Sequence, residues 1–448
     1  MKDINIDFQK AVGKSILFLG RLSSFSDEEI KLFLEKFDIA YTKTLDENVV
    51  MAVESTLLSP LEEEIATKAY QNKIPLYTIE SFERLYAKEL NRDSILMSLK
   101  LSDNQQRLFR LLHNTYLEDE LFIKLFSMYD WGNEGMFDNS QNMKISTLFA
   151  KRFFKKERFD PATYYSPVSI FEIALLNKNP DLLEVMFDLP DIKIKRSKSG
   201  IKRASTLKEA VSFNPFANKK TLTKAFRLND EEIDYFLAQN PSLAPHLQER
   251  IFERADIKIK ESLCKNRNLT NELFEKLTDI EALWRYQKID KKRFLLLKTS
   301  ISIIGENENI EKEVADTLIE QNDEETLKHL CSNPVLTRHQ LKRLYNLKNK
   351  NLYAHIAANP NTPVNILEKL FEENDKEIDS SLALNQNTPT EILEVLYNKD
   401  DFEINCHLAL NEALDIKWLQ QLQIDHRLLN YLKENKTFTQ NILNNLGI

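Results

Sequence analysis

Two consecutive stretches decide the fold of this chain: NPNTPVNILEKLFEENDKEIDSSLAL at residues 359–384 and NQNTPTEILEVLYNKDDFEINCHLAL at residues 385–410. They correspond position by position, and each begins with an asparagine that lies 26 residues after the previous one. A repeat length of roughly 20–50 residues is typical of proteins built from stacked structural units. Such proteins offer long surfaces to partners. The pair therefore predicts a repeat protein that works by binding.

The same asparagine recurs along the second half of the chain. The 26-residue spacing connects Asn214, Asn240 and Asn266, and then Asn307, Asn333, Asn359, Asn385 and Asn411. The interval of 41 residues between the two series fits two shortened units, with Gln287 in the place of the asparagine. Asn435 begins a last half-repeat. Residues 214–448 are therefore predicted to hold about ten repeats of 20–26 residues, the terminal cap included.

Each repeat reads as a pair of short helices. In residues 385–410, Thr388 is the expected N-cap of the first helix, Pro389 its first residue, and Glu391 the partner of a capping box. Apolar residues at helical spacing then mark one buried face on each helix. Asn411 ends the second helix, and we expect it to adopt the left-handed conformation that a C-terminal cap often needs.

Small residues occupy one column of the second helix in every clear repeat. The column contains Ala238, Cys264, Cys331, Ala357, Ala383 and Ala409, each after a leucine or isoleucine. Small side chains there would let neighbouring helix pairs approach closely. Two of the three cysteines lie in this column, so we expect them to be buried packing residues and not reactive thiols.

With its NPxTPxxxLxxL opening and LAxN ending, the repeat resembles the leucine-rich repeat variant family. The match is closest at residues 359–411 and looser elsewhere, covering about half of the chain. The resemblance implies a right-handed superhelix of helix pairs, an α-solenoid related to HEAT repeats. Some members of the family carry an upstream cysteine cluster that holds an iron–sulfur centre. No cysteine precedes Cys264 here, so no cofactor is expected.

The first ninety residues follow a different pattern. Apolar stretches at residues 14–20, 48–53 and 74–77 predict strands, and residues 26–37, 62–70 and 79–90 predict helices. Ser26 and Glu29 form an expected capping box. Strands that alternate with helices imply a small parallel sheet. Residues 1–90 are therefore predicted to be an α/β domain.

This order resembles the BRCT domain, in particular the type found in bacterial DNA ligases. The matching pieces are GKSILFLGRLSSFSDEEIKLFLEKF (13–37), NVVMAV (48–53) and ATKAYQNKIPLYTIESFERLY (66–86). Phosphate-binding members carry Ser or Thr before the first glycine, where this chain has Leu19, and a lysine in the region of Glu62–Glu64. Arg21, Ser23, Ser24 and Lys68 could form a substitute anion site. The alternative is that they are ordinary solvated surface residues.

Residues 91–213 are predicted to be a helical middle segment, with a loop at residues 130–142. Two basic stretches within it could contact phosphate. The first mixes cations with aromatic residues, as single-strand binders do, and includes Lys151, Arg152, Lys155 and Lys156. The second is a loop, KIKRSKSGIKR, with Lys193, Lys195, Arg196, Lys198, Lys202 and Arg203. The alternative interpretation is a helix edge with a solvated basic face for the first and a plain surface loop for the second.

Composition narrows the class of protein. The chain has 448 residues, 42% hydrophobic and 29% charged, with a formal net charge of −8. Counting from the sequence, residues 214–448 carry 31 basic and 37 acidic side chains, which argues against wholesale wrapping of nucleic acid. The start of the chain lacks the pattern of a secretory signal, and no apolar run is long enough to span a bilayer. Together with three unpaired cysteines, this predicts a cytoplasmic protein.

No sequence motif of a known enzyme class is present, so catalysis is not expected. His329, His355 and His407 share one column, 22 residues after their asparagines. Neighbouring helices pack about 8–10 Å apart, too far for adjacent histidines to share one metal ion. We expect them to be structural, or to contact a partner on one face of the solenoid.

These observations predict a mostly α-helical, cytoplasmic and bacterial adaptor with three parts: residues 1–90, 91–213 and 214–448. The repeats would dock a protein partner, and the BRCT-like domain would provide a second docking point with a link to DNA replication or repair. The alternative is a nucleic-acid-associated protein that uses the two basic stretches. No membrane contact and no small-molecule substrate are expected.

Overall fold

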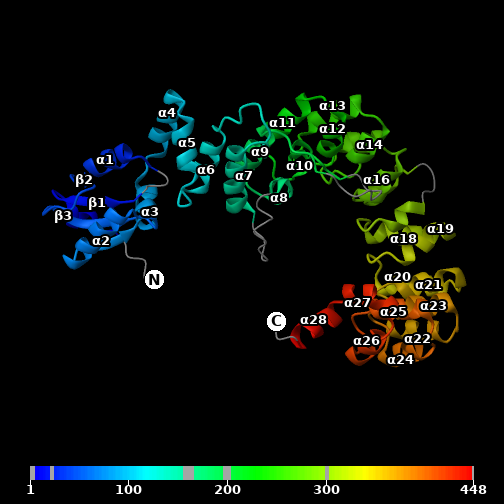
Figure 1. Cartoon of the computed structure of the whole chain (residues 1–448). Helices are drawn as coiled ribbons and strands as arrows, with labels where there is room; N and C mark the ends of the chain where they lie inside the picture. The colour runs from blue at the N-terminus through cyan, green and yellow to red at the C-terminus, as the bar shows by residue number, and fades with distance from the viewer. Residues whose placement is uncertain (1–5, 21–24, 155–165, 195–202, 298–301, 446–448) are drawn as a thin grey trace. The chain divides into compact units, whose positions relative to one another are not determined.

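The computed structural model describes residues 6–20, 25–154, 166–194, 203–297 and 302–445 of the chain (Figure 1). It is mostly helical, with 62% helix and a small four-stranded parallel sheet near the N-terminus, as the sequence predicts. The chain divides into two compact units, residues 1–237 and 238–448. The three-part division at residues 90 and 213 stays a prediction.

The sheet has the order β2-β1-β3-β4, with all neighbours parallel. Its strands are β1 (Ser15–Leu19), β2 (Ala40–Thr42), β3 (Val49–Glu54) and β4 (Leu76–Thr78). The strand β1 lies within its predicted stretch, and β3 and β4 each end one residue beyond theirs, whereas β2 was not predicted. Its three residues are exposed or half-buried and form no apolar run, so nothing in the sequence marks it as a strand.

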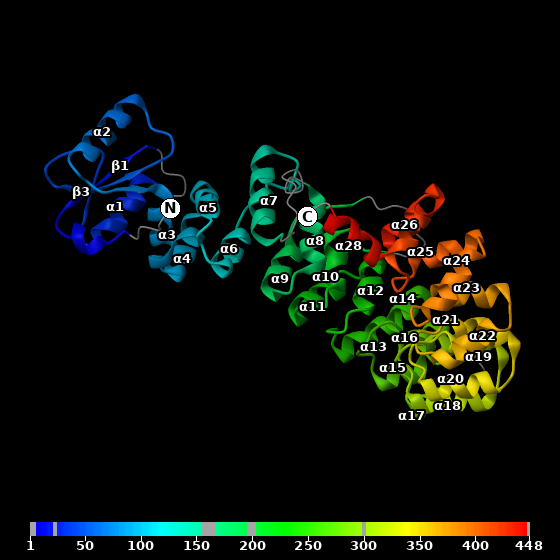
Figure 2. The same cartoon turned by 90° about the horizontal axis from the view of Figure 1, so that it is seen from below.

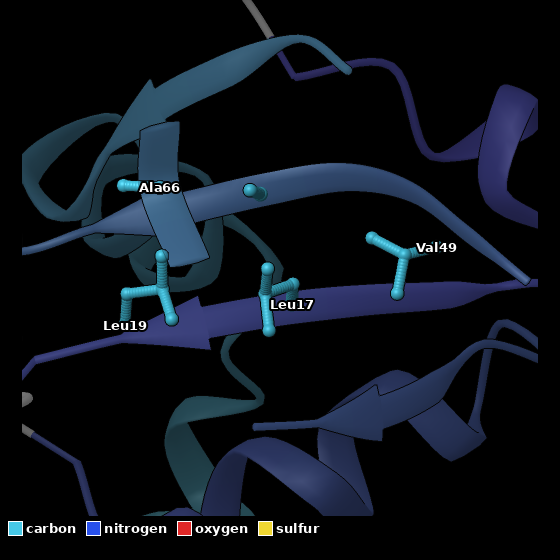
Figure 3. Close-up of a cluster of buried hydrophobic side chains, with 5 residues drawn as sticks. Leu17, Leu19, Val49 and Ala66 are labelled. Carbon is cyan, nitrogen blue, oxygen red and sulfur yellow. The ribbon is translucent and has the colours of Figure 1, made fainter. Parts of the chain in front are cut away.

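The N-terminal core lies on both faces of β1, whose five residues are all buried. On one face Leu17 and Leu19 pack with Val49 and Ala52 of β3 and with Ala66 of α2, as Figure 3 shows. On the other face the ring of Phe18 meets that of Phe82 edge-on, with centroids 5.0 Å apart. Alternate side chains of β1 thus pack into hydrophobic layers on opposite faces of the sheet. Because both faces are buried, the residues of this strand form an apolar run without alternating polar residues.

Serines begin the first two helices. Ser26 accepts a hydrogen bond from the Glu29 N–H and Glu29 returns one to Ser26, which confirms the predicted capping box of α1 (Asp27–Glu35). Ser59 and Glu62 form the same motif at α2 (Pro60–Gln71). The remaining helices of the first unit are α3 (Ile79–Glu89), α4 (Arg92–Ser102), α5 (Gln105–Leu112), α6 (Asp119–Phe126), α7 (Ser140–Phe153), α8 (Pro167–Leu176), α9 (Pro180–Asp188), α10 (Leu207–Phe213), α11 (Lys219–Arg227) and α12 (Glu231–Ala238), preceded by the 3-10 turn η1 (Phe8–Ala11).

The second unit consists of short helices in pairs. They are α13 (Pro245–Arg254), α14 (Ile257–Leu263), α15 (Asn271–Lys276), α16 (Glu281–Tyr286), α17 (Lys291–Phe294), η3 (Ser302–Glu306), α18 (Lys312–Gln321), α19 (Glu324–Cys331), α20 (Arg338–Asn346), η4 (Lys350–Leu352), α21 (Tyr353–Ala358), α22 (Val364–Phe371), α23 (Lys376–Leu384), α24 (Thr390–Asn398), α25 (Phe402–Leu410), α26 (Ile416–Leu422), η5 (His426–Leu428), α27 (Leu429–Glu434) and α28 (Lys436–Asn445). The second helices of successive pairs, α19, α21, α23, α25 and α27, pack side by side (Figures 1 and 2).

The expected left-handed conformation of the column asparagines is wrong. Asn411 has φ −75° and ψ 111°, and Asn359 and Asn385 are also extended. Left-handed residues lie instead at the turn inside each of the four pairs from α18 to α25, at Asn322, Lys348, Asn374 and Asp400. These four are again 26 residues apart, so one repeat contains two different turns. The turn between pairs is closed twice by the extended asparagine: its side-chain oxygen accepts the N–H two residues later, and its main-chain carbonyl accepts the N–H three residues later.

The predicted cap at Thr388 is also wrong. Helix α24 begins at Thr390, and its N-cap is Pro389, which has no side chain able to accept a hydrogen bond. The Thr388 hydroxyl instead donates to the carbonyl of Leu382 over 2.7 Å, and Thr362 does the same to Ile356. These buried threonines satisfy carbonyls at the end of the preceding helix, one of the groups that every helix leaves unpaired.

Candidate interaction surfaces

The column asparagines are connected to each other by hydrogen bonds. The Asn359 Nδ2 donates to the carbonyl of Cys331 over 2.7 Å and to that of Asn333 over 2.9 Å. Its Oδ1 accepts the N–H of Asn361 over 2.9 Å. The side chain is fully buried. One side-chain amide therefore closes its own turn and also joins it to the turn of the previous repeat. We call this set of hydrogen bonds a rung.

The rung recurs through the second unit. Amide nitrogens at Asn266, Asn307, Asn333, Asn385, Asn411 and Asn435 each donate to two carbonyls of the previous repeat, one of them that of the preceding column residue. Gln287 does the same, to Cys264 over 2.8 Å and Asn266 over 2.7 Å. This confirms that Gln287 takes an asparagine's place, because its longer side chain still presents a primary amide to the same pair of carbonyls.

Similar asparagines lie upstream, in the first unit. The Asn214 Nδ2 reaches the carbonyls of Ala174, Leu175 and Asn177, so Asn177 at the end of α8 belongs to this arrangement. Asn114, after α5, accepts the N–H of Tyr116 over 2.8 Å in the same kind of turn. Its Nδ2, however, is buried without a partner among the described residues. Asn114 thus forms the turn of a rung but not its link to a preceding repeat.

The three predicted histidines each contact the preceding repeat. The Nδ1 of His329 lies 2.8 Å from a carboxylate oxygen of Glu306, and that of His355 lies 3.3 Å from the Ser332 hydroxyl. The Nδ1 of His407 lies 2.7 Å from the Ser380 hydroxyl. Burial, and then the neighbouring His329 and Lys328, lower the pKa of His355. Each of the three histidines therefore contacts the repeat before its own. His329 is also close enough to His355 to affect its pKa.

The cysteines of the small column are buried, as predicted. Cys264 and Cys331 are both 0% exposed, and burial raises the pKa of each thiol to about 12. A thiol with so high a pKa is protonated at neutral pH, so it is a poor nucleophile and a poor metal ligand. Across the described ranges, no group of three or more His, Cys, Asp or Glu side chains is arranged to hold a metal ion.

The proposed anion site of the N-terminal domain is only partly visible. Arg21, Ser23 and Ser24 lie outside the described residues, and Lys68 is exposed on the last turn of α2. The Gly20 N–H, which follows β1, donates to the carboxylate of Glu62 over 2.9 Å. Hydrogen bonds from Ser59, and then that from Gly20, lower the pKa of Glu62. An ionised carboxylate therefore already accepts the main-chain N–H beside the proposed anion site.

One cation of the first basic stretch, Arg152, makes structural contacts within the protein. Lys151 is exposed, whereas Arg152 is half-buried and its Nε donates to Asp119 over 2.7 Å. The Arg152 guanidinium also hydrogen-bonds the carbonyl of Leu117 and lies 4.7 Å from the ring centre of Phe122. Lys155 and Lys156 lie outside the described residues. Arg152 thus holds α7 against α6 and is not available as a free cation.

The second basic stretch is described at its two ends. Lys193 and Arg203 are both exposed, and the main chain of Lys193 pairs with that of Thr206 in an antiparallel bridge. The bridge brings the two ends of the stretch together. Lys195, Arg196, Lys198 and Lys202 lie outside the described residues. The role of this stretch stays a prediction.

The structure also contains a groove that the sequence did not indicate. It has a volume of about 990 Å³ and lies between α6, α9 and α11, with the loop that follows α6 forming one wall. Its lining combines apolar and aromatic side chains with charged ones. These residues span positions 119–224 of the sequence. The only local signal was Trp131, a large aromatic residue in a predicted loop.

None of the helices among the described residues is both long and apolar enough to cross a bilayer. Comparisons with known proteins add no family to these observations. The chain matches no protein-family model, and neither a curated protein nor a solved structure shows significant similarity to it.

Proposed function

We propose that the protein is a non-catalytic adaptor that docks a protein partner on its repeats. In this proposal residues 214–448 form a right-handed α-solenoid and residues 1–90 form a BRCT-like domain that provides a second docking site. The observation that carries the proposal is the series of asparagine rungs. Because each rung ties a turn to the turn before it, the exposed columns of successive second helices lie at fixed spacing, as an extended recognition surface requires.

The second-helix columns supply polar side chains suited to contact a partner. Glu325, Glu377 and Glu403 occupy one exposed column, and the histidine column runs beside it. Rim charges of this kind contribute to specificity and association rate more than to affinity. The face is acidic, which fits a protein partner better than a phosphate backbone.

The N-terminal domain would dock its partner without recognising phosphate. The carboxylate of Glu62 already accepts the Gly20 N–H, and like charge would repel a phosphate group there. The resemblance to BRCT domains of DNA ligases supports a role in DNA replication or repair in a bacterial cytoplasm. That link rests on analogy between domains.

The test is a capture experiment with two charge-matched variants of the full chain. One variant carries Glu325→Lys, Glu377→Lys and Glu403→Lys on the second helices; the other carries Glu313→Lys, Glu368→Lys and Glu391→Lys on the first helices. All six glutamates are exposed. Tagged proteins are crosslinked in cells and purified with and without nuclease, and the recovered partner is then titrated against each variant by calorimetry.

The adaptor proposal expects a partner that survives nuclease treatment. We expect the second-helix variant to bind it at least tenfold more weakly, whereas the first-helix variant binds as the wild type does. Equal binding by all three proteins would contradict docking on the second-helix face. Loss of the partner on nuclease treatment would instead support nucleic-acid association through the basic stretches.

A further inference from the structure

Helix α4 carries large apolar side chains on its outward face. Ile95 and Leu99 are buried in the first unit, whereas Met97 is 59% exposed and Leu101 is 81% exposed. With 3.6 residues per turn, Met97 points directly away from the buried pair, and Leu101 lies one turn further along the same face. Single exposed apolar residues are common, but these two adjoin each other on one helix, which favours a contact with another molecule.

A shallow depression runs along the same face of α4. Within the described part of the chain its lining comes from this helix alone: Asp93, Ser94, Met97, Ser98, Leu101 and Ser102. Residues four positions apart form rows along a helix, so Met97 and Leu101 make a ridge and the three serines a groove beside it. Two helices commonly pack with the ridge of one in the groove of the other. Helix α4 therefore supplies both halves of a helix–helix contact.

Two unpaired charges beside the ridge decide the orientation of such a contact. Asp93 and Lys100 are both exposed, and neither forms an ion pair with another described residue. Arg92, the remaining charged residue of α4, is already paired with Glu118 and Glu120. Asp93 and Lys100 lie about 10.5 Å apart along the helix axis, too far to pair with each other. In an antiparallel pair of α4 helices, Asp93 of each copy lies level with Lys100 of the other.

We infer that α4 packs antiparallel against α4 of a second copy of this chain, so that the protein forms a weak homodimer. A second copy is the occupant because the ridge, the groove and both charges lie on one surface, as a two-fold interface requires. One helix of 11 residues covers less than the roughly 800 Å² per partner of a stable interface, so the dimer forms only when the chain is concentrated. This surface is separate from the second-helix face proposed above, so either can fail without the other.

The test is sedimentation velocity of the full chain, from about 1 μM to about 300 μM, where a weak dimer becomes populated. Asp93→Lys and Lys100→Asp each place like charges level with each other at both ends of the contact. An equal mixture of these two variants restores opposite charges at both ends. Leu101→Gln alters the ridge. The matched control is Glu80→Lys, because Glu80 is likewise an exposed acid in the first turn of an 11-residue helix, α3.

We expect the wild type to sediment faster as its concentration rises. Asp93→Lys and Lys100→Asp should each weaken the dimer about tenfold, and their mixture should associate at least as strongly as the wild type. Leu101→Gln should also weaken it about tenfold, and Glu80→Lys less than twofold.

Circular dichroism and urea midpoints establish that the variants are folded; if the charge variants are not, Leu101→Gln alone decides. A wild type that stays monomeric at the highest concentration would overturn the inference. A mixture that associates no better than its two components would do the same, as would unchanged association of Leu101→Gln. Equal weakening by Glu80→Lys would mean a general effect of charge and would also overturn it.

Discussion

The side-chain amide of a column asparagine does two separate jobs. Its oxygen accepts the N–H two residues later and so forms the turn, as Asx turns generally do. Its nitrogen donates to two main-chain carbonyls that lie 26 and 28 residues earlier, in the case of Asn359. Aspartate would keep the first job and lose the second, since a carboxylate has no donor. The second job therefore explains why an amide is present at each rung.

Removal of one rung should destabilise the second unit measurably. Asn359→Ala leaves two buried carbonyls without this donor, and we expect the free energy of unfolding to fall by about 2–4 kcal/mol. Asn114→Ala is the matched control, because the same turn is lost but the Asn114 Nδ2 has no partner among the described residues. It should lose about 1 kcal/mol. Urea denaturation followed by circular dichroism measures both, and equal losses would mean that the amide nitrogen contributes nothing.

The pH dependence of stability should include a contribution from His355. Its pKa is lowered in the folded state by burial and by His329 and Lys328, so protonation favours the unfolded chain. The unfolded imidazole titrates at about 6.5, so stability is fully present above that pH and declines as pH falls below it. We expect the urea midpoint to fall less between pH 7.5 and 5.5 in His355→Asn than in the wild type.

A comparison at pH 8.5 separates charge from packing in the same experiment. Any difference between wild type and His355→Asn that is present at both pH 8.5 and pH 7.5 reflects packing or the contact with Ser332. Only the additional difference at pH 5.5 reports protonation. Parallel curves over the whole range would show that His355 titrates equally in both states.

At the scale of the element, the two turns of a repeat solve two different problems. In the four pairs from α18 to α25 the inner turn uses a residue with positive φ, whereas the turn between pairs is extended and is closed by both the side chain and the carbonyl of the asparagine. Asparagine, lysine and aspartate all occur at the inner turn. A left-handed conformation is unfavourable for lysine by roughly 1–2 kcal/mol relative to glycine, so this turn retains some strain.

Lys348→Gly should therefore stabilise the second unit. Lys348 has φ 57°, which glycine adopts freely. After the entropy that glycine adds to the unfolded chain, we expect a gain of about 0.5–1 kcal/mol. The control is Lys369→Gly, at an exposed position inside α22, which should cost about 1 kcal/mol. A loss of stability at both sites would mean that the inner turn is held by contacts of the lysine side chain.

The sequence predicted elements well where a local rule applies. The capping box at Ser26 and the strands at residues 14–20 and 48–53 follow from neighbouring residues alone, and the structure confirms them. Strand β2 was missed because its pairing with β1, and not its composition, makes it a strand. Thr388 was misassigned because its partner is a main-chain carbonyl of the preceding helix, which no side-chain pattern reveals.

At the scale of the molecule, the rungs connect each repeat only to the one before it. Stability in such an arrangement is a sum of local and nearest-neighbour contributions. The two compact units, residues 1–237 and 238–448, should then respond separately to local damage. Hydrogen exchange, which measures local opening residue by residue, can distinguish these responses within the intact chain.

Gly20→Ala provides the corresponding test in the first unit. Gly20 has φ +83°, and an added Cβ would lie 2.7 Å from that of Ser55 and 2.9 Å from the Leu57 carbonyl oxygen. We expect amide protection in β1 and β3 to fall about 10–100-fold, which corresponds to roughly 1.4–2.7 kcal/mol, with no change in α21 to α25. Asn359→Ala should do the reverse.

Gly13→Ala controls for backbone conformation in this experiment. Gly13 also has a positive φ, of +69°, but nothing lies within 4 Å of an added Cβ. The difference between the two variants therefore isolates the steric contribution at Gly20. A loss of protection that spreads from β1 to α21–α25 would contradict independent responses of the two units.

The groove shows what sequence analysis could not supply at this scale. The residues that line it, such as Trp131, Asp181 and Lys224, come from separate elements, and none belongs to a recognisable motif. The repeat, in contrast, was visible because every copy repeats the same local chemistry. A periodic feature can be predicted from the order of residues in the sequence. A site formed by distant segments can be recognised only when the arrangement of those segments in space is known.

The chemistry of the rungs also bears on how such a chain can change its length. Each amide meets main-chain carbonyls, which every residue type carries. Excision of residues 359–384 would place Asn385 directly after Ala358, with the carbonyls of Cys331 and Asn333 in reach of its amide. Recombination between repeats can therefore add or remove a 26-residue unit without a compensating substitution at the new junction. The number of repeats is free to drift during evolution while each junction stays intact.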